Sequence, residues 1–220
     1  MEVLLAKIAL AAVPVVLAIT LHEAAHGYVA RRFGDSTAWM LGRVTLNPLK
    51  HIDPVGTVLV PLGILLLTGG SFLFGWAKPV PVNFGNLRHP KRDMLWVAAA
   101  GPGVNFLMAL AWALVYGLAG GDGASTSAAL KYMSLTGVFI NLSLMVLNLL
   151  PILPLDGGRI AVSLLPHSLA VPFSRTEPFG FFIVIALLVT GFLGTLMWPL
   201  MGIALALVES LTGVSLPGGL

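Results

Sequence analysis

Two histidines and a glutamate near the start of the chain have the spacing of a metal site. His22 and His26 lie four residues apart, and Glu23 directly follows the first of them. On a helix, residues four apart share a face, so the two imidazoles can bind one zinc ion. Glu23 can then accept a proton from a metal-bound water as general base. The pattern therefore predicts zinc-dependent hydrolysis.

The chain around these residues predicts that this chemistry takes place inside a membrane. We expect one helix over residues 3–33, because its first two thirds are almost entirely apolar. At about 1.5 Å per residue, His26 lies roughly 7 Å and His22 roughly 13 Å inward from Arg31 and Arg32. That arginine pair marks the expected membrane surface. Ionisable residues at such a depth are costly, and they indicate function.

Composition excludes a soluble domain and a thiolate metal site. Of the 220 residues, 57% are hydrophobic and 10% are charged, whereas soluble domains carry about 25% charged residues. Mean hydropathy is +0.95. The length suits about four to six spans of roughly 20 residues. The chain has no cysteine, so a metal must be held by histidine and carboxylate.

A zinc site with two histidines needs a third protein ligand, and a carboxylate is the usual one. The acidic residues besides Glu23 are Glu2, Asp35, Asp53, Asp93, Asp122, Asp156, Glu177 and Glu209. Asp156 stands out because it follows a transmembrane run directly, after Pro151 and Pro154 and before two glycines. Prolines unwind a helix, and glycines allow backbone geometries closed to other residues. Asp53 is the weaker alternative, since it reads as a turn residue before proline.

Topology and charge together predict a re-entrant hairpin over residues 54–76. The spans expected over 93–118 and 130–150 cross the membrane twice, so Asp156 reaches the histidines only if 54–76 makes zero or two crossings. Each stretch that flanks this segment carries four basic residues, which places both flanks in the cytoplasm. We expect the turn near Gly69 and Gly70; an ordinary single span is the alternative.

The remaining elements follow from apolar length and from proline and glycine positions. Residues 42–48 predict a short strand and turn, and residues 78–82 must be extended because of their prolines. We expect the span over 93–118 to be broken at residues 101–103. Residues 179–211 are too long for one span and predict a full span followed by a shorter helix. The fold class is thus an all-α polytopic membrane protein with short extended segments on the cytoplasmic side.

The chain resembles the site-2 protease family of intramembrane zinc metalloproteases, in a compact prokaryotic branch without a PDZ domain. The resemblance covers residues 21 to about 165. It rests on the histidine motif and on four further stretches, namely residues 42–48 (Gly-Arg-Val-Thr-Leu-Asn-Pro), 75–82 (Gly-Trp-Ala-Lys-Pro-Val-Pro-Val), 100–105 (Ala-Gly-Pro-Gly-Val-Asn) and 148–159 (Asn-Leu-Leu-Pro-Ile-Leu-Pro-Leu-Asp-Gly-Gly-Arg). Together on a membrane scaffold, these motifs are highly specific.

The resemblance implies a role for each site residue. The zinc ligands are His22, His26 and Asp156, with one Zn²⁺ per chain, and Glu23 is the catalytic base. Asn148 is implied to position substrate or to stabilise the oxyanion, and Asn105 is a weaker candidate of the same kind. The implied organisation is a single domain over residues 1–220, with a catalytic core over about 3–165 and gating or packing helices over about 177–212.

The sequence therefore predicts an intramembrane endopeptidase that cleaves transmembrane segments of membrane proteins, as in regulated intramembrane proteolysis. The expected partners are a transmembrane substrate and the lipid bilayer, not nucleic acid, and the sequence does not fix the oligomeric state. The expected location is the plasma membrane, with the site nearer the cytoplasmic face. A non-catalytic adaptor on the same fold is the alternative, and a transporter with a buried aspartate is a third reading.

Overall fold

The computed structural model describes residues 2–60, 62–63, 77–119 and 125–217, and within them the secondary structure is helical. The longest helices are α1, α4, α5 and α9, with bounds Glu2–Arg32, Pro90–Leu118, Ser125–Asn148 and Phe192–Thr212. The shorter elements are α2 (Thr37–Met40), η1 (Pro48–Lys50), η2 (Pro54–Leu59), η3 (Phe84–Asn86), α6 (Asp156–Leu164), α7 (His167–Ser174) and α8 (Glu177–Val189).

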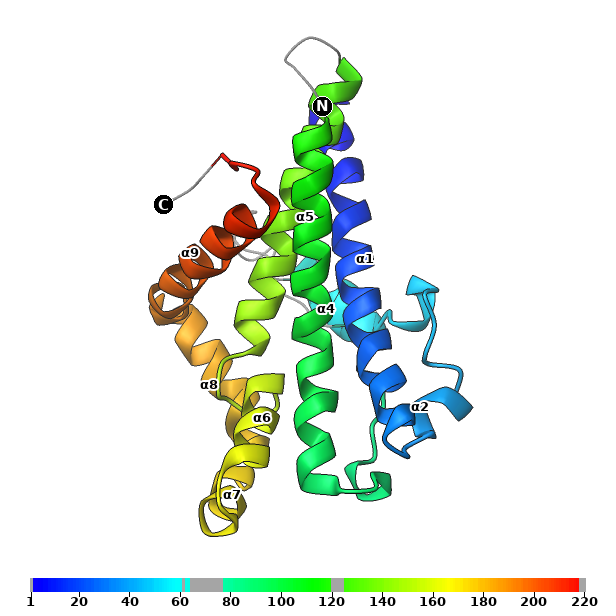
Figure 1. Cartoon of the computed structure of the whole chain (residues 1–220), viewed down its shortest axis with the longest axis vertical. Helices are drawn as coiled ribbons and strands as arrows, with labels where there is room; N and C mark the ends of the chain where they lie inside the picture. The colour runs from blue at the N-terminus through cyan, green and yellow to red at the C-terminus, as the bar shows by residue number, and fades with distance from the viewer. Residues whose placement is uncertain (1, 61, 64–76, 120–124, 218–220) are drawn as a thin grey trace.

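Helices α1, α4 and α5 stand side by side and pack against one another over most of their length (Figure 1). Helices α1 and α5 run toward the lower end of the molecule as drawn, and α4 runs back up. The end of α1, the start of α4 and the end of α5 therefore meet at one end. Helix α6, which follows α5 and begins at Asp156, packs against α4 at that end. This arrangement brings the aspartate to the half of α1 that carries the histidines.

Among the described residues, four helices are long and apolar enough to cross a membrane, or up to five if α7 and α8 form one bent span. The bend between α7 and α8 is 68°. The described residues thus form an all-α polytopic membrane protein, as predicted, with a span count inside the expected range. The first span agrees closely with the helix expected over residues 3–33.

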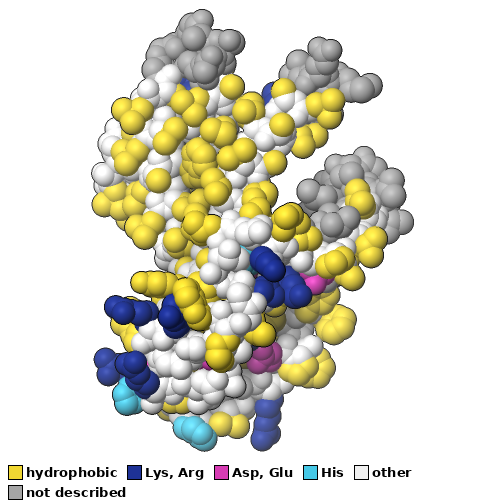
Figure 2. Space-filling model, turned by 90° about the vertical axis from the view of Figure 1, so that its right-hand side faces the viewer, with side chains coloured by type: hydrophobic (Ala, Val, Ile, Leu, Met, Phe, Trp, Pro, Cys, Tyr) yellow, Lys and Arg dark blue, Asp and Glu magenta, His cyan; other side chains and the backbone are white. Residues whose placement is uncertain are grey.

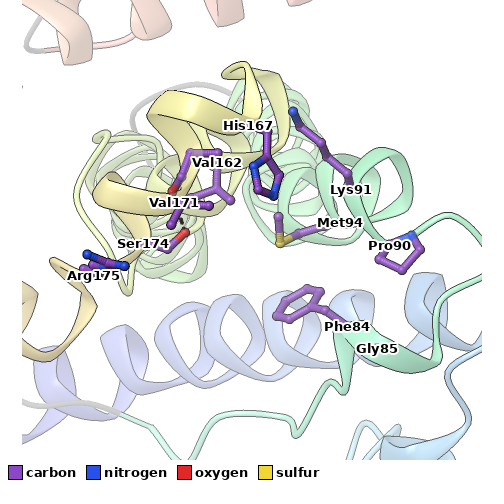
Figure 3. Close-up of a pocket in the computed structure, with 11 residues that line it drawn as sticks. Phe84, Gly85, Pro90, Lys91, Met94, Val162, His167, Val171, Ser174 and Arg175 are labelled. Carbon is purple, nitrogen blue, oxygen red and sulfur yellow. Dashed lines mark hydrogen bonds between the residues drawn. The ribbon is translucent and has the colours of Figure 1, made fainter.

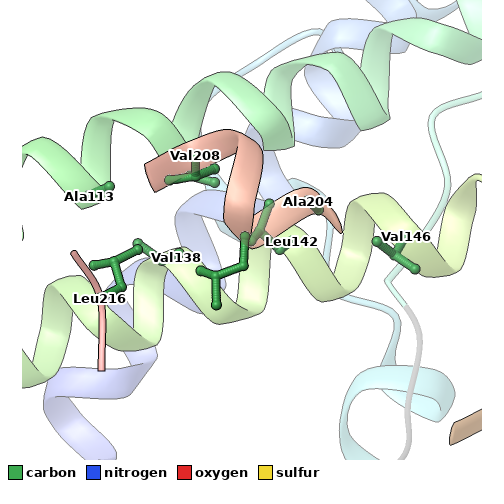
Figure 4. Packing of buried hydrophobic residues seen from close by; sticks show 9 residues of the cluster. Ala113, Val138, Leu142, Val146, Ala204, Val208 and Leu216 are labelled. Atoms are coloured by element: carbon green, nitrogen blue, oxygen red, sulfur yellow. The ribbon is translucent and has the colours of Figure 1, made fainter. Parts of the chain in front are cut away.

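Small side chains allow the long helices to approach closely. Figure 4 shows the buried cluster between α4, α5 and α9, to which α4 contributes Ala113, α5 contributes Val138 and Leu142, and α9 contributes Ala204 and Val208. Trp112 of α4 packs against the same cluster, and Gly137 of α5 accommodates its ring, since a Cβ there would lie 2.4 Å from the ring. Close backbone approach through small residues drives helix association where water supplies no hydrophobic force.

The C-terminal helices lie in the opposite order to the expected one. We predicted a full span followed by a shorter helix, but the 13-residue α8 precedes the 21-residue α9. The break falls at Gly191, whose φ of 74° lies in the left-handed region that favours glycine. Pro199 lies inside α9 and does not end it, because neighbouring groups in a membrane helix compensate the missing hydrogen bond.

Two local predictions are wrong, and one lies outside the described residues. Residues 42–48 form no strand; side-chain turns hold them instead, with the amides of Asn47 and Leu49 bonded to Thr45 Oγ1 and Asn47 Oδ1. Helix α4 continues through residues 101–103, where we expected a break. The proposed re-entrant turn at Gly69 and Gly70 lies outside the described residues.

Basic side chains are concentrated at the end of the molecule where α1 finishes. In Figure 2 hydrophobic side chains dominate the upper part of the surface, and most Lys and Arg side chains gather in the lower part. Of the twelve basic residues, only Lys7 and Lys131 belong to the start of α1 and the start of α5 at the other end. Lys7 lies there over the ring of Tyr132. The charge is therefore strongly polarised along the bundle.

Candidate metal centre

The two histidines of α1 face the interior of the bundle. His22 and His26 are buried, with 7% and 9% of their surface exposed. Their ring centroids lie 4.8 Å apart in an edge-to-face arrangement, and the two Nε2 atoms are separated by 3.1 Å. The helical spacing thus places both imidazoles on one face, as predicted from the sequence.

Asp156 reaches this face because the chain turns sharply after α5. Gly157 and Gly158 allow the turn, since a Cβ on the first would lie 2.2 Å from the Leu149 carbonyl oxygen and one on the second 2.6 Å from the Leu153 nitrogen. Asp156 Oδ2 then lies 3.3 Å from His22 Nε2 and 3.4 Å from His26 Nε2. Among the described residues, these three form the only cluster of histidine, aspartate and glutamate side chains with metal-ligand geometry.

Hydrogen bonds on the far side of each ring fix the tautomer of both histidines. His26 Nδ1 lies 2.7 Å from the Val97 carbonyl oxygen, which can only accept. His22 Nδ1 contacts Asn105 Oδ1. Both Nδ1 atoms therefore carry the proton, and both Nε2 atoms present a lone pair toward Asp156.

A chain of amides across three helices sets the orientation of Asn105. Asn141 Nδ2 on α5 donates to the Gly137 carbonyl, so its Oδ1 accepts from Asn105 Nδ2 at 2.8 Å. Asn105 Oδ1 is thereby left to accept from His22. Both asparagines are fully buried. This relay from α5 through α4 to α1 is the outer support that metal-binding imidazoles require.

The three converging atoms fit a tetrahedral cation. Two imidazole lone pairs and the Asp156 carboxylate oxygen face one another, and that oxygen is buried with no hydrogen bond from the described residues. Without a positive charge between them, such atoms repel. Tetrahedral zinc, with ligand distances of about 2.0–2.2 Å, has edges of about 3.3–3.6 Å. The separations of 3.3 and 3.4 Å to Asp156 fall in that range, and the 3.1 Å between the two Nε2 atoms lies slightly below it.

Gly101 of α4 forms the wall against which the imidazoles lie. A Cβ at this position would be 2.4 Å from His26 Nε2 and 2.6 Å from His22 Nε2. Gly103, one half-turn further along α4, has open space around it. Only glycine at 101 therefore leaves room for the two nitrogens and an ion.

Glu23 lies beside the ligands and receives a hydrogen bond from the main chain of a non-helical segment. The Val80 amide donates to Glu23 Oε2 at 2.6 Å. Val80 is itself buried, and its side chain lies over Gly27, where a Cβ would be 3.0 Å from Val80 Cγ1. Residues 77–82 form no helix, turn or bend, and the backbone of Asn83 is extended.

We call residues 77–83 the strap, because side chains and backbone from the α1–η1 region fasten it at several points. The Lys78 amide donates to the His51 carbonyl at 2.9 Å. Arg43 donates to the Lys78 and Pro79 carbonyls at 2.9 and 3.3 Å. At its far end, the Asn83 amide donates to Asp35 Oδ2 at 2.7 Å. The strap is therefore held over the end of α1 that carries the site.

Asp35 is a residue that sequence reasoning did not assign to the site region. It is fully buried, and its carboxylate also accepts from the amide and hydroxyl of Thr37 and from Asn86 Nδ2. Burial raises the pKa of Asp35, but the bonds from Thr37, Asn83 and Asn86 outweigh it and lower the pKa below its ordinary value. Its position directly after α1, in a Gly-Asp-Ser turn, was the available signal.

The two predicted asparagines occupy different environments. Asn105 contacts a ligand imidazole, whereas Asn148 donates to the Leu144 carbonyl at 2.9 Å within its own helix. The substrate or oxyanion role of both stays a prediction. Asn141 was missed, although an asparagine in the apolar run of α5 is a polar group at membrane depth.

A separate pocket of about 580 Å³ lies between η3, the start of α4, and helices α6 and α7 (Figure 3). Phe84 and Met94 line it on one side and Val162 and Val171 on the other. It contains none of the predicted site residues. The pocket and the metal centre are connected along the chain at two places. The strap leads into η3, and Asp156 is the first residue of α6.

Comparisons with known proteins identify a family and relatives of this chain. Residues 118–191 match the model of peptidase family M50. The chain is 37% identical over 193 residues to "Putative zinc metalloprotease YwhC" of Bacillus subtilis, covering 86% of this chain and 84% of that protein. It is 32% identical over 176 residues to "Putative zinc metalloprotease Rip2" of Mycolicibacterium smegmatis, covering 79% of this chain and 64% of that protein. No solved structure matches the chain significantly.

The family match begins at the end of α4 and includes Asp156, while the relatives extend the similarity over most of the chain. The sequence resemblance is thereby confirmed: the chain belongs to peptidase family M50, the site-2 protease family of membrane zinc metalloproteases.

Proposed function

We propose that this protein is an intramembrane zinc endopeptidase that hydrolyses peptide bonds in or near transmembrane segments of other proteins. The observation that carries the proposal is the convergence of two imidazole lone pairs and one buried carboxylate oxygen within a helical membrane bundle. Membership of a metalloprotease family supports the reaction type.

In this proposal His22, His26 and Asp156 hold one Zn²⁺ and leave its fourth position open. When bound, the ion lowers the pKa of water and polarises the scissile carbonyl. Glu23 accepts the proton from the attacking water. Because the Val80 amide occupies Glu23 Oε2, Oε1 is the oxygen available for that transfer among the described contacts. Asn105 and Val97 keep the ligand nitrogens unprotonated.

The substrate is a transmembrane helix, whose peptide bonds are hidden in its own hydrogen bonds, so it must unwind locally before hydrolysis. An extended segment of the enzyme can pair with the unwound chain by β-addition. Of the two segments considered from the sequence, residues 42–46 contain a turn and bends, whereas residues 78–82 contain no helix, turn or bend. The strap is therefore the favoured pairing surface, although Pro79 and Pro81 cannot donate.

We further propose a location in the plasma membrane with the site nearer the cytoplasmic face. The concentration of basic residues at the end where α1 finishes supports this orientation. The last two helices, α8 and α9, are proposed to gate or pack around the catalytic core.

Reconstitution with a reporter tests the proposal. The purified protein is placed in lipid nanodiscs with zinc and a panel of single-span reporter proteins, and cleavage is followed by gel and mass spectrometry. The wild type should cleave within the reporter span, and Glu23→Gln should bind zinc without cleaving. Glu209→Gln, at the far end of α9, serves as the matched control and should cleave like the wild type.

The other outcomes identify the alternatives. Zinc binding with no cleavage of any reporter by the wild type would favour a non-catalytic adaptor. A protein that binds no zinc would favour a transporter and would overturn the proposal.

A further inference from the structure

The strap presents one isolated amide to the catalytic region. Proline has no amide hydrogen and fixes its own φ, so Pro79 and Pro81 leave Val80 as the single donor between them. That donor is bonded to Glu23 Oε2. Because the residues on either side of Val80 cannot donate, the position of this amide depends on how the strap is fastened at its two ends.

Asp35 fastens the end of the strap that leads into η3. Its Oδ2 accepts from the Asn83 amide at 2.7 Å, three residues after Val80. Its Oδ1 accepts from the Thr37 amide at 3.0 Å, from the Thr37 hydroxyl, and from Asn86 Nδ2 at 3.2 Å. The two oxygens thus serve different partners, one mainly the turn after α1 and the other the strap.

We propose that Asp35 is a positioning residue for the catalytic base: it holds the strap at the depth where the Val80 amide binds and orients the Glu23 carboxylate. The inference rests on the proposed proteolytic function for its catalytic consequence, but the fastening of the strap can be tested without it. Asp35 touches neither the metal ligands nor Glu23 in the described contacts, so it acts through residues 80–83.

Replacing one carboxylate oxygen of Asp35 with an NH₂ group separates its bond to the strap from its bonds to Thr37 and Asn86. In Asp35→Asn, the amide oxygen can keep the partners of Oδ1, while the new NH₂ group faces the Asn83 amide, donor against donor. The strap should therefore be released selectively. The matched control is Thr37→Val, which removes a hydroxyl bonded to the same carboxylate but leaves the Asn83 bond intact.

The first readout is amide hydrogen exchange of the purified protein in nanodiscs, which requires no substrate. Asp35→Asn should speed exchange over residues 77–86 and leave α1 and α4 protected, whereas Thr37→Val should exchange like the wild type in that segment. The second readout is bound zinc, which should be unchanged in both variants, because neither touches a ligand.

The third readout is cleavage of a reporter. For Asp35→Asn, we expect kcat to fall by about 10- to 100-fold, the cost of a small misplacement of catalytic groups. Val80→Pro, which removes the amide itself, should give a similar loss with the Asp35 bonds intact. The double variant should lose no more than either single variant, because both remove the same interaction.

The outcomes distinguish the two proposals. Faster exchange without any cleavage activity, wild type included, would leave the fastening role supported while contradicting the proteolytic function. Unchanged exchange over the strap in Asp35→Asn, or additive losses in the double variant, would overturn the positioning role. So would equal loss of kcat in Thr37→Val.

Discussion

Asp35, which is buried, and Asp156, whose side chain is 13% exposed, are two carboxylates at the same end of the bundle, and their surroundings are opposite. The Asp35 carboxylate accepts four hydrogen bonds from Thr37, Asn83 and Asn86. Asp156 Oδ2 accepts none from the described residues and faces two imidazole nitrogens instead. Burying a carboxylate is costly unless hydrogen bonds or a positive charge compensate. Hydrogen bonds from the protein satisfy the first, and the second has the arrangement that a cation would complete.

The aspartate side chain thus has a structural role at position 35 and an arrangement suited to chemistry at position 156. A saturated carboxylate has no capacity left for a metal or a reacting group, so its contribution lies in holding segments together. A carboxylate oxygen without hydrogen bonds, next to imidazoles whose tautomers are fixed, remains able to bind a cation.

Removal of the unsaturated carboxylate should abolish the metal site. Loss of a residue that supports a metal ligand lowers metal affinity by about 10- to 100-fold. Asp156→Ala removes a direct ligand, so zinc affinity should fall by more than that. Zinc content after dialysis against a graded chelator measures this. Asp93→Asn is the control, because Asp93 caps α4 by accepting from the His89 amide. Retained zinc in Asp156→Ala would contradict the assigned ligand set.

Filling the wall of the site should act almost as strongly. Gly101→Ala places a methyl group 2.4 Å from His26 Nε2, so one imidazole must move and zinc binding should drop by at least about tenfold. Gly103→Ala on the same helix meets open space and should bind zinc like the wild type. Equal behaviour of the two variants would show that the imidazoles do not lie against α4.

Breaking the amide relay should weaken the site moderately. Asn141→Leu removes the partner that orients Asn105, and we expect zinc affinity to fall by about tenfold. Asn148→Leu on the same helix removes a similar bond to a backbone carbonyl four residues back, and it should leave zinc affinity unchanged. A loss in Asn148→Leu would place that residue closer to the metal than its contacts indicate.

Loss of the hydrogen-bonded Asp35 carboxylate should lower the stability of the fold. Asp35→Asn should lower the free energy of unfolding by about 1–3 kcal/mol, the usual cost of leaving a buried donor unpaired. Thermal unfolding in detergent at neutral pH measures this, with Thr37→Val expected to lose less.

The same carboxylate should confer a pH dependence of known sign. Since the folded-state pKa of Asp35 is lowered, its contribution is fully present above the ordinary pKa of about 3.9. It is lost as the pH falls through the folded-state value. The stability difference between wild type and Asp35→Asn should therefore shrink below about pH 4. A difference that grows on acidification would contradict this assignment.

The parts of the site that local sequence could predict are those governed by helix periodicity and apolar length. The common facing of His22 and His26 and the long apolar helix α1 both follow from neighbouring residues. The resemblance supplied Asp156. The strand expected over residues 42–48 failed because a strand needs a partner, and local turns at Thr45 and Asn47 satisfied those amides instead.

The order of the C-terminal helices failed for a different reason. Pro199 and Gly191 are both helix breakers by type, and sequence alone did not rank them. In the fold, only Gly191 takes a left-handed φ, while α9 accommodates its proline. The surroundings of each residue in the folded protein therefore decide which of the two ends a helix.

By itself, the sequence determined that this is a helical membrane protein with a zinc-type histidine pair, because helix periodicity and hydropathy depend on residues close in the chain. Tertiary structure alone decided the histidine tautomers, which depend on partners 71 and 83 residues away. It also decided that Val80 reaches Glu23 from 57 residues away and that Asp35 fastens the strap from 48. Contacts of that separation come from packing three helices together, and no local pattern encodes them.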